Sequence, residues 1–250
     1  RDFCLSRGLG DVYKRQVLGR EDISREIAPI YNEERQTDGV KLLYHDVETN
    51  GIGYVTALFD LSEIEEELLP YAGILQSVLG IIDTEHYGYG ELFNEINVHT
   101  GGIGTSLELY TDVTKVKEKE FRATFEIKGK ALYPKLDVLF AMMREILSRT
   151  RLTDTKRLYE IVAQVKSRLQ MYLTGSGHSA AAVRAMAEFS DSSWVTDQIS
   201  GIAFYGLIEQ LEKHFEEKKA FLFDMDGLIF DTEQLFLSLI HISEPTRQAE

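Results

Sequence analysis

Residues 40–61 read VKLLYHDVETNGIGYVTALFDL, and this stretch decides the fold. Two runs rich in apolar, β-branched and aromatic residues, Val40–Tyr44 and Ile52–Phe59, lie on either side of Asn50-Gly51. An Asn-Gly pair between such runs is typical of a tight turn, because both residues tolerate positive φ. We therefore predict two strands that are joined as a β-hairpin.

The sequence that follows predicts a helix and two more strands. Ser62, with Glu65 three residues later, matches a capping box, so we expect a helix from Ser62 to about Ile81. Gly101-Gly102 should interrupt the chain before a strand at Ile103–Tyr110. Residues 121–128 then alternate between apolar and polar, which predicts a half-buried strand with one wet face. The apolar positions are Phe121, Ala123, Phe125 and Ile127, and the polar positions are Arg122, Thr124, Glu126 and Lys128.

Beyond residue 135 the apolar residues recur at helical spacing. The first apolar stripe lies in residues 136–147, the second in 158–169 and the third in Val195–Phe215. The first two consist of Leu136, Leu139, Phe140, Met143 and Leu147, and of Leu158, Ile161, Val162, Val165 and Leu169. Strands followed by a run of helices predict an α+β fold, with helices packed on one face of a largely antiparallel sheet.

Four further blocks of sequence carry a resemblance to a known family. They are LLPYAGILQSVLG (68–80), ELFNEINVHTGGIGTSLEL (91–109), YLTGSGHSAAAVRAM (172–186) and SWVTDQISGIAFYGLIEQLEKHF (193–215). Together with the opening stretch they resemble the pitrilysin/insulinase class of zinc peptidases, in the branch that contains the presequence proteases. The matching region of that family is the front of the C-terminal half, which carries no zinc. The resemblance implies a fragment of a metalloendopeptidase that degrades unfolded peptides in an enclosed chamber.

The catalytic motif of that family is absent from this sequence. The motif is HxxEH, whose histidines hold zinc and whose Glu activates a bound water. No HxxEH occurs here, and no two histidines show HxxxH spacing. The two halves of such enzymes look like duplicated relatives, and the best counterpart of the motif is Gly73-Ile74-Leu75-Gln76-Ser77. Gly, Gln and Ser cannot form a zinc site, and an ordinary amphipathic helix is sufficient to explain these residues.

The resemblance therefore implies an inactive chain with no metal ligand and no cofactor of its own. Zinc is expected on the missing catalytic half of the same polypeptide, which would be the main partner, together with peptide substrates. The family's substrate-clamping Arg and Tyr belong further toward the C-terminus, so no site residue is carried over from the family. A non-enzymatic domain that binds peptides or dimerises is the alternative.

Three other features have both a functional and a structural interpretation. His86 could take part in a lone metal site with its acidic sequence neighbours, although their spacing fits no helical ligand pair. His99 is expected to end a helix, where the helix dipole favours it. Gly175–Ser179, which reads GSGHS, predicts a turn between helices, although its amides could bind an anion. We expect Trp194 to lie in the core. The acidic neighbours of His86 are Glu85, Glu91 and Glu95.

Both ends of the chain resemble a translated DNA adapter. Leu237–Arg247 reads LSLIHISEPTR and Ser6–Gln16 reads SRGLGDVYKRQ. One DNA segment can encode the first on one strand and the second, residue for residue, on the other. We therefore expect residues 1–16 and 237–250 to be sequencing artefacts, which also removes Cys4, the single cysteine. A genuine basic N-terminal arm is the alternative.

A second family resemblance begins at Lys219. Lys219–Glu233 reads KAFLFDMDGLIFDTE and resembles the start of haloacid-dehalogenase-like phosphatases and phosphomutases. In that family the first Asp, here Asp224, attacks phosphorus, the second, Asp226, is a general acid/base, and Mg²⁺ bridges the site. The further motifs of that family have no room before residue 237. We therefore expect a linker at 17–39, a peptidase-associated domain at 40–218 and, at 219–236, the start of a phosphatase domain in a chimeric assembly. A genuine fusion is the alternative.

Composition limits the possible partners. The formal net charge is −14, which argues against nucleic acid, because phosphate binding requires clustered Lys and Arg. No apolar run approaches the length of about 20 residues that a membrane helix requires. We therefore expect neither a nucleic-acid nor a membrane partner, and a cytoplasmic location. The acidic surface could favour basic peptides, although a solvated surface explains it more simply.

Overall fold

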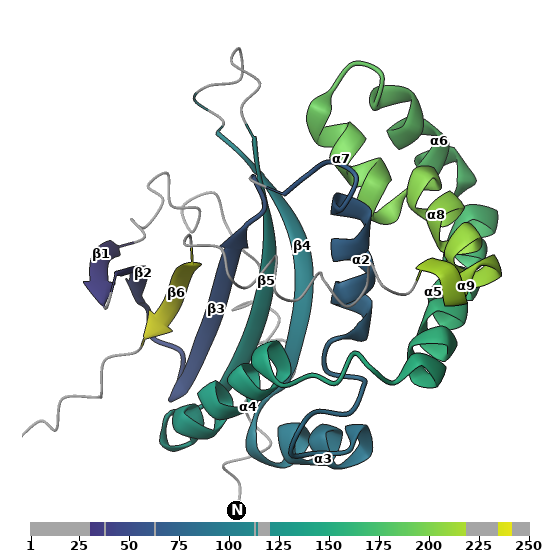
Figure 1. The fold of residues 1–250 in the computed structure, drawn as a ribbon. Helices are drawn as coiled ribbons and strands as arrows, with labels where there is room; N and C mark the ends of the chain where they lie inside the picture. The colour runs from purple at the N-terminus through teal and green to yellow at the C-terminus, as the bar shows by residue number, and fades with distance from the viewer. Residues whose placement is uncertain are drawn as a thin grey trace, which may run out of the picture. The chain divides into compact units, whose positions relative to one another are not determined.

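The computed structural model describes residues 31–37, 39–62, 64–112, 114, 121–218 and 235–241. From Asn32 onward these residues belong to one unit. The unit is built on a six-stranded sheet with the strand order β1-β2-β6-β3-β5-β4, shown in Figure 1. The strands are β1 (Asn32–Thr37), β2 (Val40–Asp46), β3 (Ile52–Asp60), β4 (Ile103–Thr111), β5 (Phe121–Leu132) and β6 (Leu235–His241). Among these neighbours only β2 and β6 are parallel.

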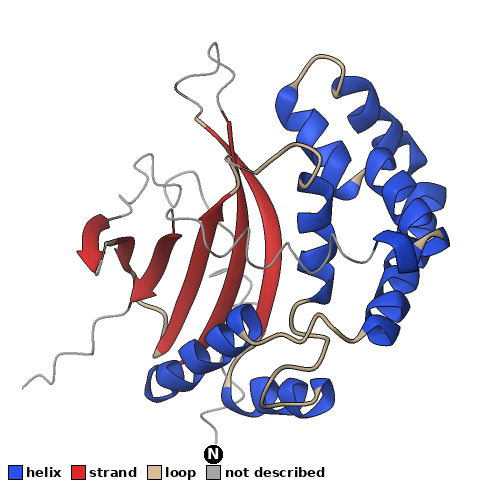
Figure 2. Cartoon of the chain, in the orientation of Figure 1, coloured by secondary structure: helices blue, strands red, loops and turns tan. Residues whose placement is uncertain are grey.

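Helices cover the sheet on one side, as Figure 2 shows. Helix α4 (Leu136–Ser148) packs on β5, and α2 (Leu69–Val78) packs beside β4. An outer group of helices then packs around α2, with α5 against α8 and α7 against both α2 and α8. The remaining helices are α3 (Tyr89–His99), α5 (Thr155–Gly175), α6 (Gly177–Met186), α7 (Asp191–Ser200), α8 (Ile202–Lys213) and α9 (Phe215–Lys218), with a 3₁₀ turn at Tyr133–Lys135. The predicted α+β fold with a largely antiparallel sheet is confirmed.

The apolar stripes predicted from helical spacing mostly lie in the core. In α5, Leu158, Ile161, Val162 and Val165 are at most 3% exposed. Trp194 packs against the same core. In α4 the prediction is partly wrong, because Phe140 is 40% exposed while Met142 and Ile146, which the stripe omitted, are buried. The helix is rotated slightly from the predicted face.

The Asn50-Gly51 turn forms, but the hairpin does not. Asn50 and Gly51 have φ of 55° and 81°, and the amide of Ile52 donates to the carbonyl of Thr49 at 3.4 Å. The two strands that the turn joins do not pair with each other, because β6 lies between them, parallel to β2 and antiparallel to β3 (Figure 1). The prediction that these two strands pair with each other is therefore wrong. The Asn-Gly sequence specifies the turn but does not specify which strands pair.

Helix α2 begins seven residues later than predicted. The amide of Ser62 donates to the carboxylate of Asp60 at 2.9 Å, and the Ser62 hydroxyl also binds that carboxylate. Ser62 is therefore part of a local turn and does not cap a helix. The helix starts at Leu69, with Pro70 in its first turn, where the missing amide hydrogen requires no partner. It ends at Val78, before Gly80, whose φ is 83°.

Two other boundaries differ from the prediction. The expected linker at 17–39 contains β1, which pairs with β2 from Asn32↔His45 to Thr37↔Val40. All six β1 residues are exposed, which explains why no apolar pattern marked the strand. The expected single helix at Val195–Phe215 is divided at Gly201 into α7 and α8. Residues 235–241, which overlap the expected adapter, form β6.

The structure also bears on the membrane prediction. Of the helices in the part of the chain that the structure describes, none is both long and apolar enough to cross a bilayer.

Candidate functional site

Gly73, which was compared above with the first histidine of HxxEH, is a packing contact in α2. The residue is buried and faces the α7–α8 region. A Cβ atom at this position would lie 2.8 Å from the carbonyl oxygen of Ile199 and 3.0 Å from the ring of Phe204. Real Cβ atoms do not approach backbone oxygen that closely, so the site has no room for any side chain. Helix α2 therefore approaches α7 closely at Gly73.

The Ser77 hydroxyl and the backbone carbonyl of Gln76, in the same segment, have structural partners. The hydroxyl of Ser77 donates to the carbonyl of Gly73 at 3.2 Å, within the helix. The carbonyl of Gln76 accepts from the hydroxyl of Thr105 in β4 at 2.9 Å. The segment therefore fixes α2 to the sheet and provides no ligand set.

The histidines that were considered as candidates lie in separate places. The ring Nδ1 of His86 lies 3.1 Å from Glu145 in α4, and both ring nitrogens lie 3.0 Å from the guanidinium of Arg149, which also pairs with Glu85. His99 is the last residue of α3, as predicted, and pairs with Glu95 at 3.4 Å. Gly175 and Gly177 end α5 and begin α6, so the GSGHS stretch is a helix–helix turn. Across the described ranges no group of three His, Cys, Asp or Glu side chains could hold a metal ion.

Glu145 is a nearly buried carboxylate that is held by several hydrogen bonds. Its side chain is 8% exposed and accepts from the backbone amide of His86 at 3.1 Å. Burial alone would raise the pKa of Glu145, but hydrogen bonds from Thr84 and from the amide and ring of His86 outweigh it and lower the pKa below 4.5. The carboxylate thereby fixes the loop before α3 to α4.

A second polar cluster lies on β4 and β5, on the sheet face opposite Phe125 and Ile127. The predicted wet face is wrong at its centre, because Thr124 is 2% and Glu126 0% exposed. Glu126 accepts from the hydroxyls of Tyr110, at 2.7 Å, and Thr124, at 2.9 Å. Its other oxygen lies 2.8 Å from the ammonium of Lys128. Buried carboxylates persist when they are paired in this way.

The cluster changes the ionisation of Tyr110. Burial and the hydrogen bond to Glu126 raise the pKa of Tyr110 to about 12. The phenol therefore stays protonated at physiological pH and acts as a hydrogen-bond donor. The phenol of Tyr110, the hydroxyl of Thr124 and the ammonium of Lys128 together hold the buried carboxylate of Glu126 in place.

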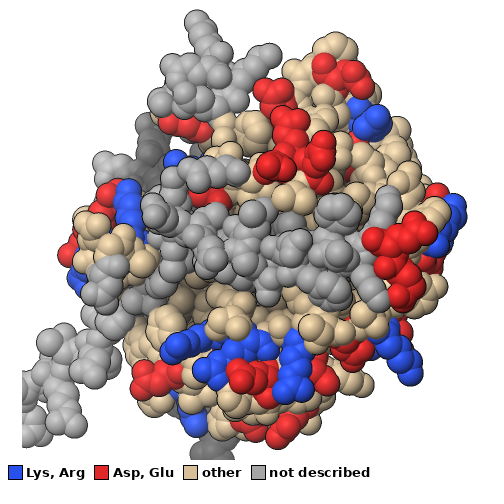
Figure 3. All heavy atoms as spheres, viewed as in Figure 1, with Lys and Arg blue, Asp and Glu red and all other residues tan. Residues whose placement is uncertain are grey.

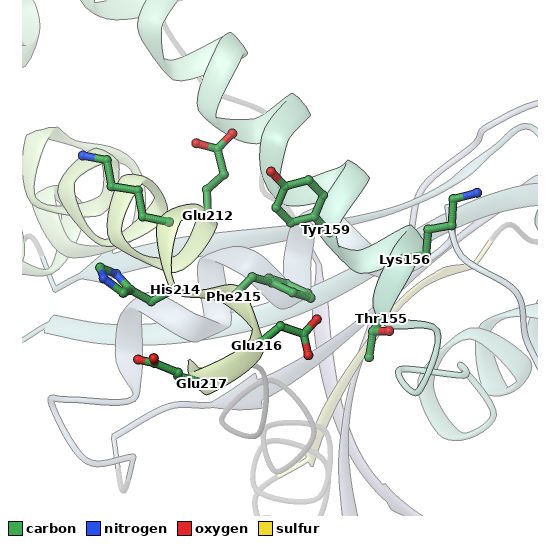
Figure 4. A pocket seen from close by; sticks show the side chains of 9 residues that line it. Thr155, Lys156, Tyr159, Glu212, His214, Phe215, Glu216 and Glu217 are labelled. Carbon is green, nitrogen blue, oxygen red and sulfur yellow. The ribbon is translucent and has the colours of Figure 1, made fainter.

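A cleft of about 510 Å³ opens between the start of α5 and the junction of α8 with α9 (Figure 4). The rings of Tyr159 and Phe215 meet edge to face in it, with centroids 5.4 Å apart. Thr155 and His214 lie on opposite sides of the view, and Glu216 lies on the same side as Thr155 (Figure 4). The other lining residues are Lys156, Glu212, Lys213 and Glu217. The cleft is thus lined by an aromatic pair and by charged side chains of both signs.

The charged surface is mixed. Figure 3 shows Asp and Glu side chains gathered near the upper centre and at the right edge of this face, while Lys and Arg collect in a band near the bottom. Neither kind forms a continuous stripe in this view. Asp224 and Asp226, the candidate phosphatase residues, lie outside the described residues.

Comparison with known proteins finds relatives over most of the chain. The family model described as Peptidase M-16C associated matches residues 17–211. "Protein HypA" of Clostridium perfringens is 34% identical over 232 residues, which are 91% of this chain and 23% of that protein. "Presequence protease 1, chloroplastic/mitochondrial" of Arabidopsis thaliana is 30% identical over 89% of this chain and 20% of its own length. The chain thus spans about a fifth of the length of these relatives.

A solved structure shares the fold. The crystal structure of a conserved protein from Enterococcus faecalis V583 matches 86% of this chain and 49% of its own with a TM-score of 0.62, at 12% sequence identity. At that identity the likeness concerns the fold alone.

Proposed function

The chain belongs to the Peptidase M-16C associated family, and from that premise we propose that it is a non-catalytic segment of a zinc-dependent metalloendopeptidase. The whole enzyme would degrade unfolded peptides in an enclosed chamber, in the cytoplasm. Zinc would be held by a catalytic half of the same polypeptide, and this segment would supply wall and scaffold. The names of the relatives, presequence proteases among them, support a role in peptide degradation.

The observation that carries the proposal is the packing of Gly73. An HxxEH helix must present two imidazoles and a carboxylate to one metal ion with an open coordination position. Here the corresponding helix position has a carbonyl oxygen 2.8 Å from where a Cβ would stand. A helix packed so closely supports a scaffold role for this part of the enzyme.

The test is a hydrolysis assay on the purified chain. An unstructured fluorogenic peptide is incubated with the chain and Zn²⁺, with and without EDTA, and full-length presequence protease 1 of Arabidopsis thaliana serves as the positive control. We expect no hydrolysis above that of peptide alone and no stoichiometric zinc by elemental analysis. Turnover that depends on zinc and is abolished by EDTA would contradict the proposal.

We also propose that residues 1–16 and 237–250 are translated adapter and that 219–236 begin a haloacid-dehalogenase-like segment joined by chimeric assembly. The exact two-strand coding relation between the ends supports the first point, and the end of the family match at residue 211 is compatible with the second. Long-read sequencing of the source DNA tests both. Reads that continue upstream of residue 17 into a frame with HxxEH and never enter DMDG are expected. Reads that cross Lys218–Ala220 without a break would instead make Asp224 and Asp226 part of a genuine fusion phosphatase.

A further inference from the structure

The sheet contains a slot one strand wide between two strands that are consecutive in the chain. A tight turn at Asn50-Gly51 joins β2 to β3, yet these strands are separated by β6. Six residues of β6 pair with β2 and six pair with β3. Neighbouring strands lie about 4.8 Å apart, so the edges of β2 and β3 must stand about 10 Å apart to admit a strand. Figure 1 shows β6 in this position.

An occupant of the slot binds through its backbone on both sides. At an ordinary open sheet edge an added strand pairs with one neighbour, and the side chains at alternate positions give specificity. Between β2 and β3 it pairs with two, and its two neighbours run in opposite directions. The slot therefore offers about twice the ladder of an open edge and accepts only an extended segment that runs antiparallel to β3.

The register sets the side-chain pattern that the slot accepts. Positions 235, 237 and 239 pair with Phe59, Ala57 and Val55, which are 6%, 6% and 1% exposed. Directly paired residues of an antiparallel sheet share a face, so a peptide bound in this register would meet the core at the positions opposite Val55, Ala57 and Phe59. Positions 236, 238 and 240 pair with Leu58, Thr56 and Tyr54, on the other face. An occupant therefore requires apolar residues at every second position.

The segment that fills the slot is not part of the family-matched stretch. The match ends at residue 211, whereas the occupant is Leu235–His241. A sheet built by the matched region thus accepts a strand from outside it. The adapter origin proposed for residues 237–241 fits this view, because such a segment has not been selected for the slot. Recognition then depends on extended backbone and alternating apolar residues more than on a particular sequence.

We propose that the slot between β2 and β3 is a strand-acceptor site for extended peptides with apolar residues at alternate positions. Leu235–His241 occupies it as a replaceable internal ligand. This binding requires no zinc and no catalytic residue of the chain. Its test is therefore independent of the hydrolysis assay.

The first experiment measures peptide binding by fluorescence anisotropy. A fluorescein-labelled peptide with the sequence of residues 235–241 is titrated with the full chain and with its Leu237→Pro variant. Proline removes a ladder hydrogen bond and should release the internal strand from a central position. Because the internal strand competes at high effective concentration, we expect the variant to bind the peptide at least tenfold more tightly than the unchanged chain does.

A matched peptide with proline at its Ser238 position is the control and should bind neither protein. Equal binding of the two peptides, equal binding by the two proteins, or no binding by a variant whose circular dichroism is unchanged would each overturn the proposal.

The second experiment tests the register by disulfide trapping and remains decisive if the proline variant fails to fold. In a Cys4→Ser background, Ala57→Cys is combined with Leu237→Cys, its direct partner, or with Phe236→Cys, which pairs with Leu58. Mild oxidation should cross-link the first pair and leave the second reduced. Equal cross-linking of both pairs, or of neither, would show that the slot does not hold this strand.

Discussion

At the scale of residues, the packing of Gly73 sets how closely helix α2 approaches its neighbours. The carbonyl oxygen of Ile199 and the ring of Phe204 occupy the space that a side chain at this position would need. Sequence alone showed that HxxEH is absent, because the motif is readable as letters. It could not identify the packing, because the contact partners Ile199 and Phe204 lie more than a hundred positions away in the chain.

Gly73→Ala should destabilise the protein by about 1–3 kcal/mol, because the added methyl group meets a backbone oxygen that cannot move away easily. Gly206→Ala is the matched control, since Gly206 lies inside α8 and a Cβ there meets nothing within 4 Å. We expect the control to raise stability by about 0.5–1 kcal/mol. Urea unfolding monitored by circular dichroism measures both. A Gly73→Ala variant as stable as the control would mean that the contact between α2 and α7 is loose.

Glu145→Gln should lower stability at neutral pH by about 1–3 kcal/mol, because a buried set of hydrogen bonds loses its charged acceptor. The pH dependence has a definite sign. The pKa of Glu145 in the folded protein lies below 4.5, so the unfolded state binds more protons in that range. The stabilisation is present above about pH 4.5 and is lost as the pH falls through the folded pKa.

The free energy of unfolding of the variant should therefore fall less steeply with decreasing pH when urea unfolding is repeated between about pH 7 and pH 3. Glu160→Gln, at a 45% exposed carboxylate, is the control and should follow the unchanged chain. An equal dependence of unfolding free energy on pH for Glu145→Gln and the unchanged chain would contradict the lowered pKa of Glu145.

At the scale of elements, the break between α7 and α8 depends on one buried carboxylate. Asp197 is 0% exposed and accepts from the amides of Ile202, at 2.9 Å, and Ala203, at 3.4 Å, in the first turn of α8. The guanidinium of Arg184 lies 2.7 Å from its other oxygen. The carboxylate thus caps one helix from inside the preceding one, and the apolar period across residues 195–215 hid the interruption.

Asp197→Ala should lower the free energy of unfolding by about 2–4 kcal/mol, because it removes the cap of α8 and leaves the amides of Ile202 and Ala203 without their carboxylate acceptor. Asp197→Asn keeps an oxygen for the amides and loses only the ion pair with Arg184, whose side chain is 50% exposed. We expect the Asn variant to lose less than half as much stability in thermal unfolding. Equal losses would assign the effect to the ion pair instead of the cap.

Helices and strands could be predicted from sequence where their buried residues recur at the regular spacing of the element. The α5 stripe and the alternation of β5 have such periods, and both elements form. The exposed strand β1 has no such period, and the turn of Ser62 onto Asp60 mimics a capping box. The burial of Glu126 depends on Tyr110 of the neighbouring strand, and sequence spacing does not show such a cross-strand partner.

At the scale of the whole unit, stability should be graded across the sheet. The central strands β3 and β5 hold buried residues such as Val55 and Phe125, whereas every residue of edge strand β1 is exposed. Amides of a strand that is held by few buried contacts exchange through local opening.

Hydrogen exchange followed by mass spectrometry should therefore show β1 exchanging at least a hundredfold faster than β5. Helix α5 is a suitable internal reference, because its core residues Leu158 and Val162 are fully buried. Protection of β1 equal to that of β5 would place β1 inside a larger, more stable assembly.

The position of β6 also has a consequence for the order in which the chain can fold. When this chain folds, the turn between β2 and β3 can form from neighbouring residues, but the sheet that includes both strands is continuous only after residues 235–241 have joined it. Pairing between residues so distant in sequence closes a long loop and is slow. Until then β2 and β3 expose unpaired backbone at the middle of the future sheet, where other chains can add. A folding intermediate without β6 in place would therefore bind a chaperone that recognises extended segments.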